Sequence, residues 1–170
     1  PLCLEAVAIR KKMAGDSNSV YANSLNLLAA LYEKMARYKE SETHFNEALA
    51  ILKITVGEKH IQYAQCQHNL GGLYMKMEQF DKAEPLFLQA LETRKNVLGE
   101  KHYEYANSLQ ALAAVYMNTG RPGEAETMML KAVPVIKNAL GEKSMDYANS
   151  LNILAALCRS LGQYEKAEPL

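Results

Sequence analysis

Polar residues that could bind another molecule recur along this chain at a fixed spacing. Pairs of polar side chains three residues apart return every 42 residues, and seven of these eight side chains are carboxamides. The pairs are Asn23 and Asn26, Gln65 and His68, Asn107 and Gln110, and Asn149 and Asn152. A carboxamide both donates and accepts hydrogen bonds. A row of carboxamides could therefore bind the backbone of an extended peptide, whatever side chains that peptide carries.

The spacing places each set of residues on one face of a helix. Steps of 3, 4, 3 and 1 connect Asn23, Asn26, Ala30, Glu33 and Lys34. Later copies of the same face add Lys76, Asn118 and Arg159. Three cations, Lys34, Lys76 and Arg159, give the face a mild positive bias, which would favour an acidic or C-terminal segment. A glutamate on the first copy offsets part of that bias.

Two other interpretations of the amides stay open. They could be ordinary solvated helix residues, or they could hydrogen-bond between neighbouring helices and only stiffen the chain. We favour ligand contact, because lysine or glutamate would serve solubility equally well at an exposed position.

The other residues with catalytic potential lack the spacing of a reactive site. The GEK sequences do not form a phosphate-binding loop, and the four histidines do not pair at metal-ligand spacing. His60 and His102 repeat one position beside a predicted helix start, and its other copies hold Asn18 and Ser144. We expect helix caps at this position. We therefore predict a protein that is not an enzyme and that needs no metal or cofactor.

The three cysteines, Cys3, Cys66 and Cys158, have neither CxxC nor metal-ligand spacing. Cys3 and Cys158 stand at positions that other copies fill with larger apolar or aromatic residues, so we expect them to fill a core. Scattered thiols in odd number favour a reducing compartment, and we predict a cytoplasmic location.

The composition implies no electrostatic partner. The formal net charge is zero, with 49% hydrophobic and 22% charged residues, which predicts a folded protein that binds neither nucleic acid nor a membrane. No apolar run approaches the roughly 18 residues of a membrane span. Because Pro1 falls inside a repeat, we expect the natural protein to be longer.

The frame that positions these residues is a 42-residue repeat. The string YANSL starts at Tyr21, Tyr105 and Tyr147, and YAQCQ fills the remaining slot at Tyr63. A fixed period of this size is typical of a solenoid, in which each unit buries its apolar face against its neighbours. We predict a single array over 1–170, with repeats at 19–60, 61–102 and 103–144. Residues 1–18 would hold the second helix of a preceding repeat and a turn, and 145–170 a first helix and the start of a second.

Apolar spacing divides each repeat into two helices. A 4, 3, 4 step through Tyr21, Leu25, Leu28 and Tyr32 predicts helix A over about Ser19–Met35. A second periodic run predicts helix B, ending near Val56, where Gly57 supplies a stop. Small residues recur where the two helices would meet, and a large residue follows them on helix B. Each repeat is therefore predicted to be a helical hairpin.

The second repeat carries LGGLY and AEPLF, which resemble the L-G-x-x-Y and A-x-x-x-F core of tetratricopeptide repeats. That family has 34-residue units. The 42-residue period, YANSLNLLAALY and the LGEKH turn resemble the longer variant of kinesin light chains, nephrocystin-3 and many bacterial signalling proteins. The resemblance implies an all-α fold, a right-handed superhelical solenoid of antiparallel helix pairs. It also implies that the A helices line a concave groove that commonly holds an extended peptide.

On this basis we predict a protein–protein interaction scaffold that binds an extended segment of a partner in the groove. Two alternatives stay open. The chain could be a regulatory or sensor array within a larger multidomain signalling protein. It could also be a structural array whose terminal half-repeats, ending at Pro1 and just after Pro169, stack head to tail.

Two residues depart from the repeat pattern. Gln67 stands where the other copies hold Leu25, Leu109 and Leu151, and it would place an amide in the hairpin seam. Pro134 lies inside a predicted helix B. An interior proline removes a backbone hydrogen bond, so we expect a kink or an early end of that helix.

Overall fold

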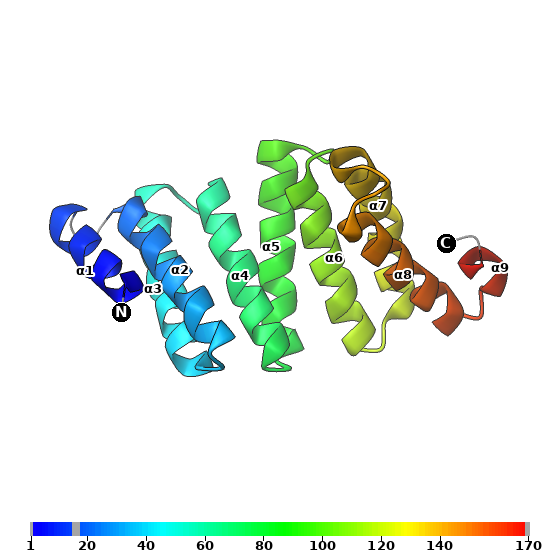
Figure 1. The fold of residues 1–170 in the computed structure, drawn as a ribbon, viewed down its shortest axis with the longest axis horizontal. Helices are drawn as coiled ribbons and strands as arrows, with labels where there is room; N and C mark the ends of the chain where they lie inside the picture. Colours follow the sequence, from blue (N-terminus) through cyan, green and yellow to red (C-terminus); the bar gives the residue numbers. More distant parts are fainter. Residues whose placement is uncertain (1, 15–17, 169–170) are drawn as a thin grey trace. The chain divides into compact units, whose positions relative to one another are not determined.

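The computed structural model describes residues 2–14 and 18–168, and all of its regular structure is helical. The helices in this described part are α1 (Leu2–Ala14), α2 (Ser19–Lys34), α3 (Tyr38–Thr55), α4 (Ile61–Lys76), α5 (Phe80–Leu98), α6 (Tyr103–Asn118), α7 (Pro122–Leu140), α8 (Met145–Ser160) and α9 (Tyr164–Ala167) (Figure 1). No strand occurs among the described residues. The predicted all-α class is therefore confirmed.

The chain divides into two compact units, Pro1–Thr93 and Arg94–Leu170. In the first unit α1 packs on α2, α2 on α3, and α3 on α4. In the second unit α6 packs on α7, α7 on α8, and α8 on α9. Contacts between consecutive helices are what a chain of helical hairpins requires. The division into repeats remains our proposal, with α2, α4, α6 and α8 as its A helices.

Each hairpin closes around small residues that let the two helices approach. In the first hairpin Ala29 and Phe45 are both fully buried, and Ser41 Oγ donates to the Ala29 carbonyl at 2.8 Å. In the second unit Ala113 and Met129 are fully buried at the corresponding positions. The predicted pairing of a small residue on helix A with a large one on helix B is therefore confirmed.

The A helices begin at side-chain caps. Asn18 Oδ1 accepts from the Val20 N–H at 2.7 Å, and Ser144 Oγ accepts from the Tyr147 N–H at 3.2 Å. His60 and His102 accept through Nδ1 from the N–H two residues ahead. Each cap satisfies a backbone donor that the helix itself leaves without a partner. The predicted capping role of the two histidines is confirmed.

The hairpin turns adopt a left-handed backbone conformation in every copy. The four positions are Ala36, Glu78, Gly120 and Gly162, with φ between 57° and 74°. Glycine adopts this conformation without steric cost, whereas a residue with a Cβ is strained there. Ala36 and Glu78 therefore carry strain that the glycines of the second unit avoid.

Of the kink or early end expected at Pro134, the early end is wrong, because α7 continues past this residue to Leu140. Pro134 is exposed, so the carbonyl that loses its helical hydrogen bond one turn earlier lies on the solvent side of the helix. Tight packing of Ala132 and Ile136, both fully buried, holds the flanking turns.

Core positions also hold the atypical residues of the sequence. Gln67 is 2% exposed, which confirms an amide in the hairpin seam. Cys66 and Cys158 are buried thiols, and burial raises the pKa of Cys66 to about 12. The side chain of Cys3 lies outside the described residues, as do Pro1 and Pro169, at the ends that the head-to-tail alternative invoked.

Candidate functional site

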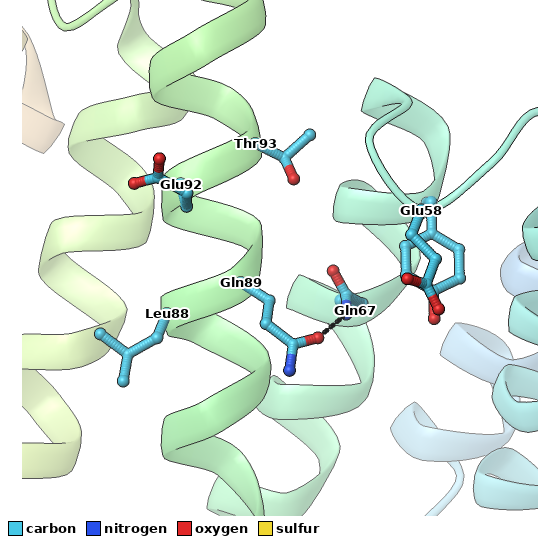
Figure 2. A pocket seen from close by; sticks show the side chains of 7 residues that line it. Glu58, Gln67, Leu88, Gln89, Glu92 and Thr93 are labelled. Carbon is cyan, nitrogen blue, oxygen red and sulfur yellow. Dashed lines mark hydrogen bonds between the residues drawn. The ribbon is translucent and has the colours of Figure 1, made fainter.

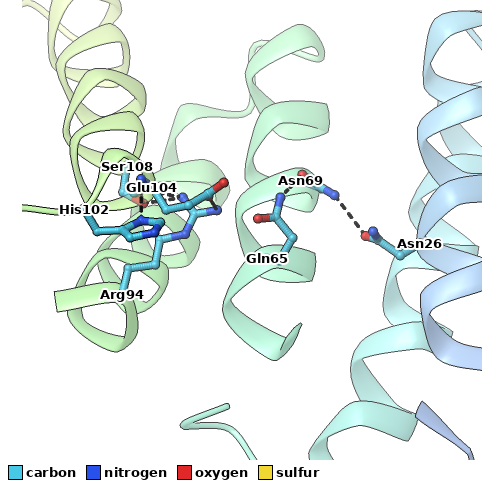
Figure 3. Close-up of polar contacts among 7 residues, drawn as sticks. All are labelled: Asn26, Gln65, Asn69, Arg94, His102, Glu104 and Ser108. Atoms are coloured by element: carbon cyan, nitrogen blue, oxygen red, sulfur yellow. Dashed lines mark hydrogen bonds and ion pairs between the residues drawn. The ribbon is translucent and has the colours of Figure 1, made fainter. Parts of the chain in front are cut away.

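In the first unit, the amides of the predicted binding face link two A helices. Asn69 Nδ2 on α4 donates to Asn26 Oδ1 on α2 at 3.1 Å, and Gln65 Nε2 donates to Asn69 Oδ1 at 3.0 Å (Figure 3). Asn23 is half-buried on the preceding turn of α2. Part of this face therefore stiffens the packing of α2 on α4, which is one of the interpretations left open by the sequence.

One of the two cations expected on this face in the first unit, Lys76, is neutralised by an ion pair. Lys76 Nζ lies 2.7 Å from Glu33 Oε1, and that hydrogen bond raises the pKa of Lys76. Glu33 is 16% exposed, so the pair is partly shielded from water. Lys34 is exposed. His68 packs edge-on against the ring of Phe87, with centroids 5.1 Å apart, and so contributes to the hairpin core.

The second unit leaves more of its amides available to solvent. Gln110 Nε2 on α6 donates to Ser150 Oγ on α8 at 2.8 Å, which places the two A helices in contact. Asn118 Nδ2 donates to the Ala114 carbonyl of its own helix at 2.7 Å. Within the described part of the chain, the side chains of Asn107, Asn149 and Asn152 form no hydrogen bond.

The last predicted residue of this face, Arg159, lies at a pocket of about 350 Å³. Ala156, Ser160 and Tyr164 complete its lining. Arg159 is exposed and can donate hydrogen bonds to a carboxylate, whereas Ser160 Oγ already donates to the Leu157 carbonyl at 2.8 Å.

A second pocket, of about 490 Å³, lies beside α4 and α5 in the first unit (Figure 2). Its lining is Glu58, Tyr63, Gln67, Leu88, Gln89, Glu92 and Thr93. Gln67 Nε2 donates to Gln89 Oε1, whereas the buried Gln67 Oε1 accepts no hydrogen bond from the described residues. The sequence pattern singled out Gln67 as an amide in the hairpin seam, but it did not predict a pocket here.

Among the described residues, no group of histidine, cysteine, aspartate or glutamate side chains could hold a metal ion. No helix in the same part of the chain is both long and apolar enough to cross a membrane.

Comparison with known proteins decides the family. The tetratricopeptide repeat model matches residues 1–54, 20–96, 62–117 and 110–170, which together span the chain. The chain belongs to the tetratricopeptide repeat family. The predicted tetratricopeptide array of the kinesin-light-chain-like kind is confirmed. Tetratricopeptide repeats are general protein-interaction scaffolds, and proteins of this family are generally not catalytic.

Several solved structures are similar to the chain over nearly its full length. BtubC (BKLC) from P. vanneervenii has 25% identity and a TM-score of 0.88, covering 99% of this chain and 67% of that one. The TPR-like repeats of a Podosopora anserina protein described as a kinesin light chain have 24% identity and a TM-score of 0.82, covering 99% and 79%. The apo form of RapI has 20% identity and a TM-score of 0.81, covering 96% and 58%, which shows the fold alone. No curated protein matches the chain by sequence.

The tetratricopeptide array contains a buried cation that the sequence reasoning missed. Arg94 is fully buried, and its guanidinium lies 2.7 Å from Glu104 Oε2 and donates to Ser108 Oγ at 2.6 Å (Figure 3). Burial lowers the pKa of Arg94, and the Glu104 carboxylate opposes that shift. The recurrence of arginine at Arg10, two periods earlier, could have indicated this position. Arg10 also donates to a serine of the following helix, Ser24, at 2.6 Å.

One buried tyrosine is expected to make the first unit less stable as the pH becomes alkaline. Tyr74 is 8% exposed and its hydroxyl donates to Glu42 Oε1 at 2.7 Å. Burial first, and then the Glu42 carboxylate, raise the pKa of Tyr74 from 10.0 to about 12. Because the folded-state pKa is raised, the stabilisation is complete below pH 10 and is lost as the pH rises through about 12.

We expect the free energy of unfolding to fall between pH 10 and 12, with Tyr74 contributing a slope of about 1.4 kcal/mol per pH unit. Tyr74→Phe should make that slope shallower by about this amount in urea titrations at each pH. Tyr164→Phe is the matched control, because Tyr164 is 69% exposed. Equal slopes for Tyr74→Phe and the parent protein would show that the hydroxyl ionises as freely in the folded chain as in the unfolded one.

Proposed function

We propose that this tetratricopeptide array is a non-catalytic scaffold that binds an extended peptide segment of a partner protein along its A helices. The observation that supports this proposal most directly concerns the hydrogen bonding of Asn107 and Asn149 in the second unit. Their side chains form no hydrogen bond within the described residues, while α6 and α8 are held together by Gln110 and Ser150.

The chemistry of these amides fits a peptide backbone. Each carboxamide can donate to a peptide carbonyl and accept from a peptide N–H, and two of them on neighbouring helices can hold one extended strand. Asn149 and Asn152 are exposed, so binding requires no rearrangement of the core. Arg159, at the end of the same face, would favour a peptide with an acidic residue or a free carboxyl terminus.

The test is a screen of displayed peptides, followed by affinity measurements on the selected peptides. We expect a shared motif that binds with low-micromolar or weaker affinity. Asn107→Ala combined with Asn149→Ala should weaken binding by roughly tenfold, because each neutral hydrogen bond contributes about 0.5–1.5 kcal/mol.

Asn138→Ala is the matched control, because Asn138 is an exposed asparagine on α7, away from the A helices. It should leave the affinity unchanged. If the double variant bound the selected peptides as tightly as the control, the A-helix face would not be the binding site.

A further inference from the structure

The pocket beside α4 and α5 offers several hydrogen-bond acceptors and no cationic lining residue. Glu58 contributes a carboxylate, and Gln67 contributes an amide oxygen at the buried end. No lysine, arginine or histidine is among its lining residues. A ligand for this pocket should therefore carry a positive charge and several hydrogen-bond donors.

Gln67 is the residue that points to a ligand. Its side chain is 2% exposed, and its Oε1 accepts no hydrogen bond from the described residues although Nε2 is bound to Gln89. Figure 2 shows the oxygen of Gln67 directed towards the side of the pocket where Glu58 and Thr93 lie. Burying an amide oxygen without a hydrogen-bond donor costs free energy on folding. A ligand that donates to this oxygen would remove that cost, and the gain would favour binding.

The repeat itself shows that this glutamine is not needed for packing. Leucine occupies the same position in the other copies, at Leu25, Leu109 and Leu151, and Leu25 and Leu109 are 1% exposed. The array can therefore fill this space with an apolar side chain. Gln67 introduces hydrogen-bonding capacity only in the copy that carries the pocket.

The rim of the pocket favours a planar cation. The Glu58 carboxylate lies 2.6 Å from Lys53 Nζ, but both side chains are more than half exposed, so this pair can open at little cost. Tyr63 provides an aromatic wall. A guanidinium can stack on that ring while its N–H groups reach the amide oxygen and the Glu58 carboxylate. An ammonium group is more strongly hydrated and has no planar face to stack.

We propose that this pocket binds the arginine side chain of a partner polypeptide, with the guanidinium donating to Gln67 Oε1. This inference goes beyond the proposed peptide binding along the A helices. It rests on residues of α4, α5 and the loop that precedes α4, whereas the peptide proposal rests on Asn107 and Asn149, so either can fail without the other.

The experiment uses three small probes on the whole chain: N-acetyl-arginine amide, its neutral isostere N-acetyl-citrulline amide, and N-acetyl-lysine amide. Binding is followed by the NMR shifts of the side-chain amides of Gln67 and Gln89. We expect saturable shifts at millimolar concentration with the arginine probe, and shifts at least several-fold smaller with the other two. Equal responses to the citrulline or lysine probe, or no saturable shift with arginine, would overturn the proposal.

Variants locate the binding. Gln67→Leu should abolish the response of Gln89 to the arginine probe while the chain stays folded and gains thermal stability, because it restores the residue of the other copies. Gln67→Met is a second variant of similar length without an acceptor, and it should give the same loss. Gln62→Leu on the same helix, outside the pocket lining, is the control and should bind as the parent does. An unchanged arginine response in both Gln67 variants would exclude Gln67 as the acceptor.

Discussion

Arg94→Ala is expected to lower the free energy of unfolding by about 3 kcal/mol. Arg94 is fully buried, and its guanidinium bonds to Glu104 and Ser108 of the next A helix. The alanine variant loses the packing of a long side chain and leaves a cavity. Removing one partner of a buried ion pair costs about 3–5 kcal/mol, and we take the low end because Glu104 is 35% exposed and can be rehydrated.

The repeat provides a matched control for Arg94→Ala. One period later, Ile136 stands at the position of Arg94, Asp146 at that of Glu104 and Ser150 at that of Ser108. Arg94→Ile therefore reproduces a set of residues that the same fold already packs with Ile136 fully buried. We expect this variant to remain within about 1 kcal/mol of the parent, because apolar replacement of buried charge is often neutral.

Chemical denaturation of the three proteins separates packing from charge. A large loss with alanine and a small one with isoleucine would mean that Arg94 acts mainly by filling space between the helices. Equal losses in both variants would contradict this account and would show that the contacts with Glu104 and Ser108 carry the stability.

The fold could be predicted from the sequence because the residues that determine it recur at equivalent positions in each repeat. Apolar spacing, the small residue opposite a large one, and the capping side chain each recur with a 42-residue period, and the structure confirms all three. A feature that occurs in one copy alone has no such support. The pocket around Gln67 and Gln89 is of that kind, because it depends on where two helices place their side chains.

Equivalent positions in the repeat do not make equivalent hydrogen bonds, as the amides of the A helices show. Asn26 and Gln110 occupy equivalent positions, yet Asn26 accepts from an asparagine of the next A helix, whereas Gln110 donates to a serine. The difference comes from side-chain length and from the residue that the neighbouring helix presents. The helix face that carries the amides was therefore predictable. Which of these amides form hydrogen bonds to neighbouring helices was not.

Gly71→Ala is the second variant with a large expected effect, a net loss of about 1–2 kcal/mol. A Cβ at Gly71 would lie 2.8 Å from Phe87 Cε1 and 3.0 Å from Phe87 Cζ. The ring cannot easily yield, since Phe87 is 2% exposed and His68 packs against it. Overpacking of this kind costs about 1–3 kcal/mol, and the better helix propensity of alanine returns part of that.

The neighbouring glycine isolates the steric effect. A Cβ at Gly72 would meet no atom within 4 Å, so Gly72→Ala should be neutral or stabilising by up to about 1 kcal/mol. Adding Phe87→Met to Gly71→Ala copies the buried pair Ala113 and Met129 and should recover part of the loss. If Gly71→Ala were as stable as Gly72→Ala in urea denaturation, the second hairpin could open to admit a methyl group. The close approach of α4 to Phe87 would then not be required for stability.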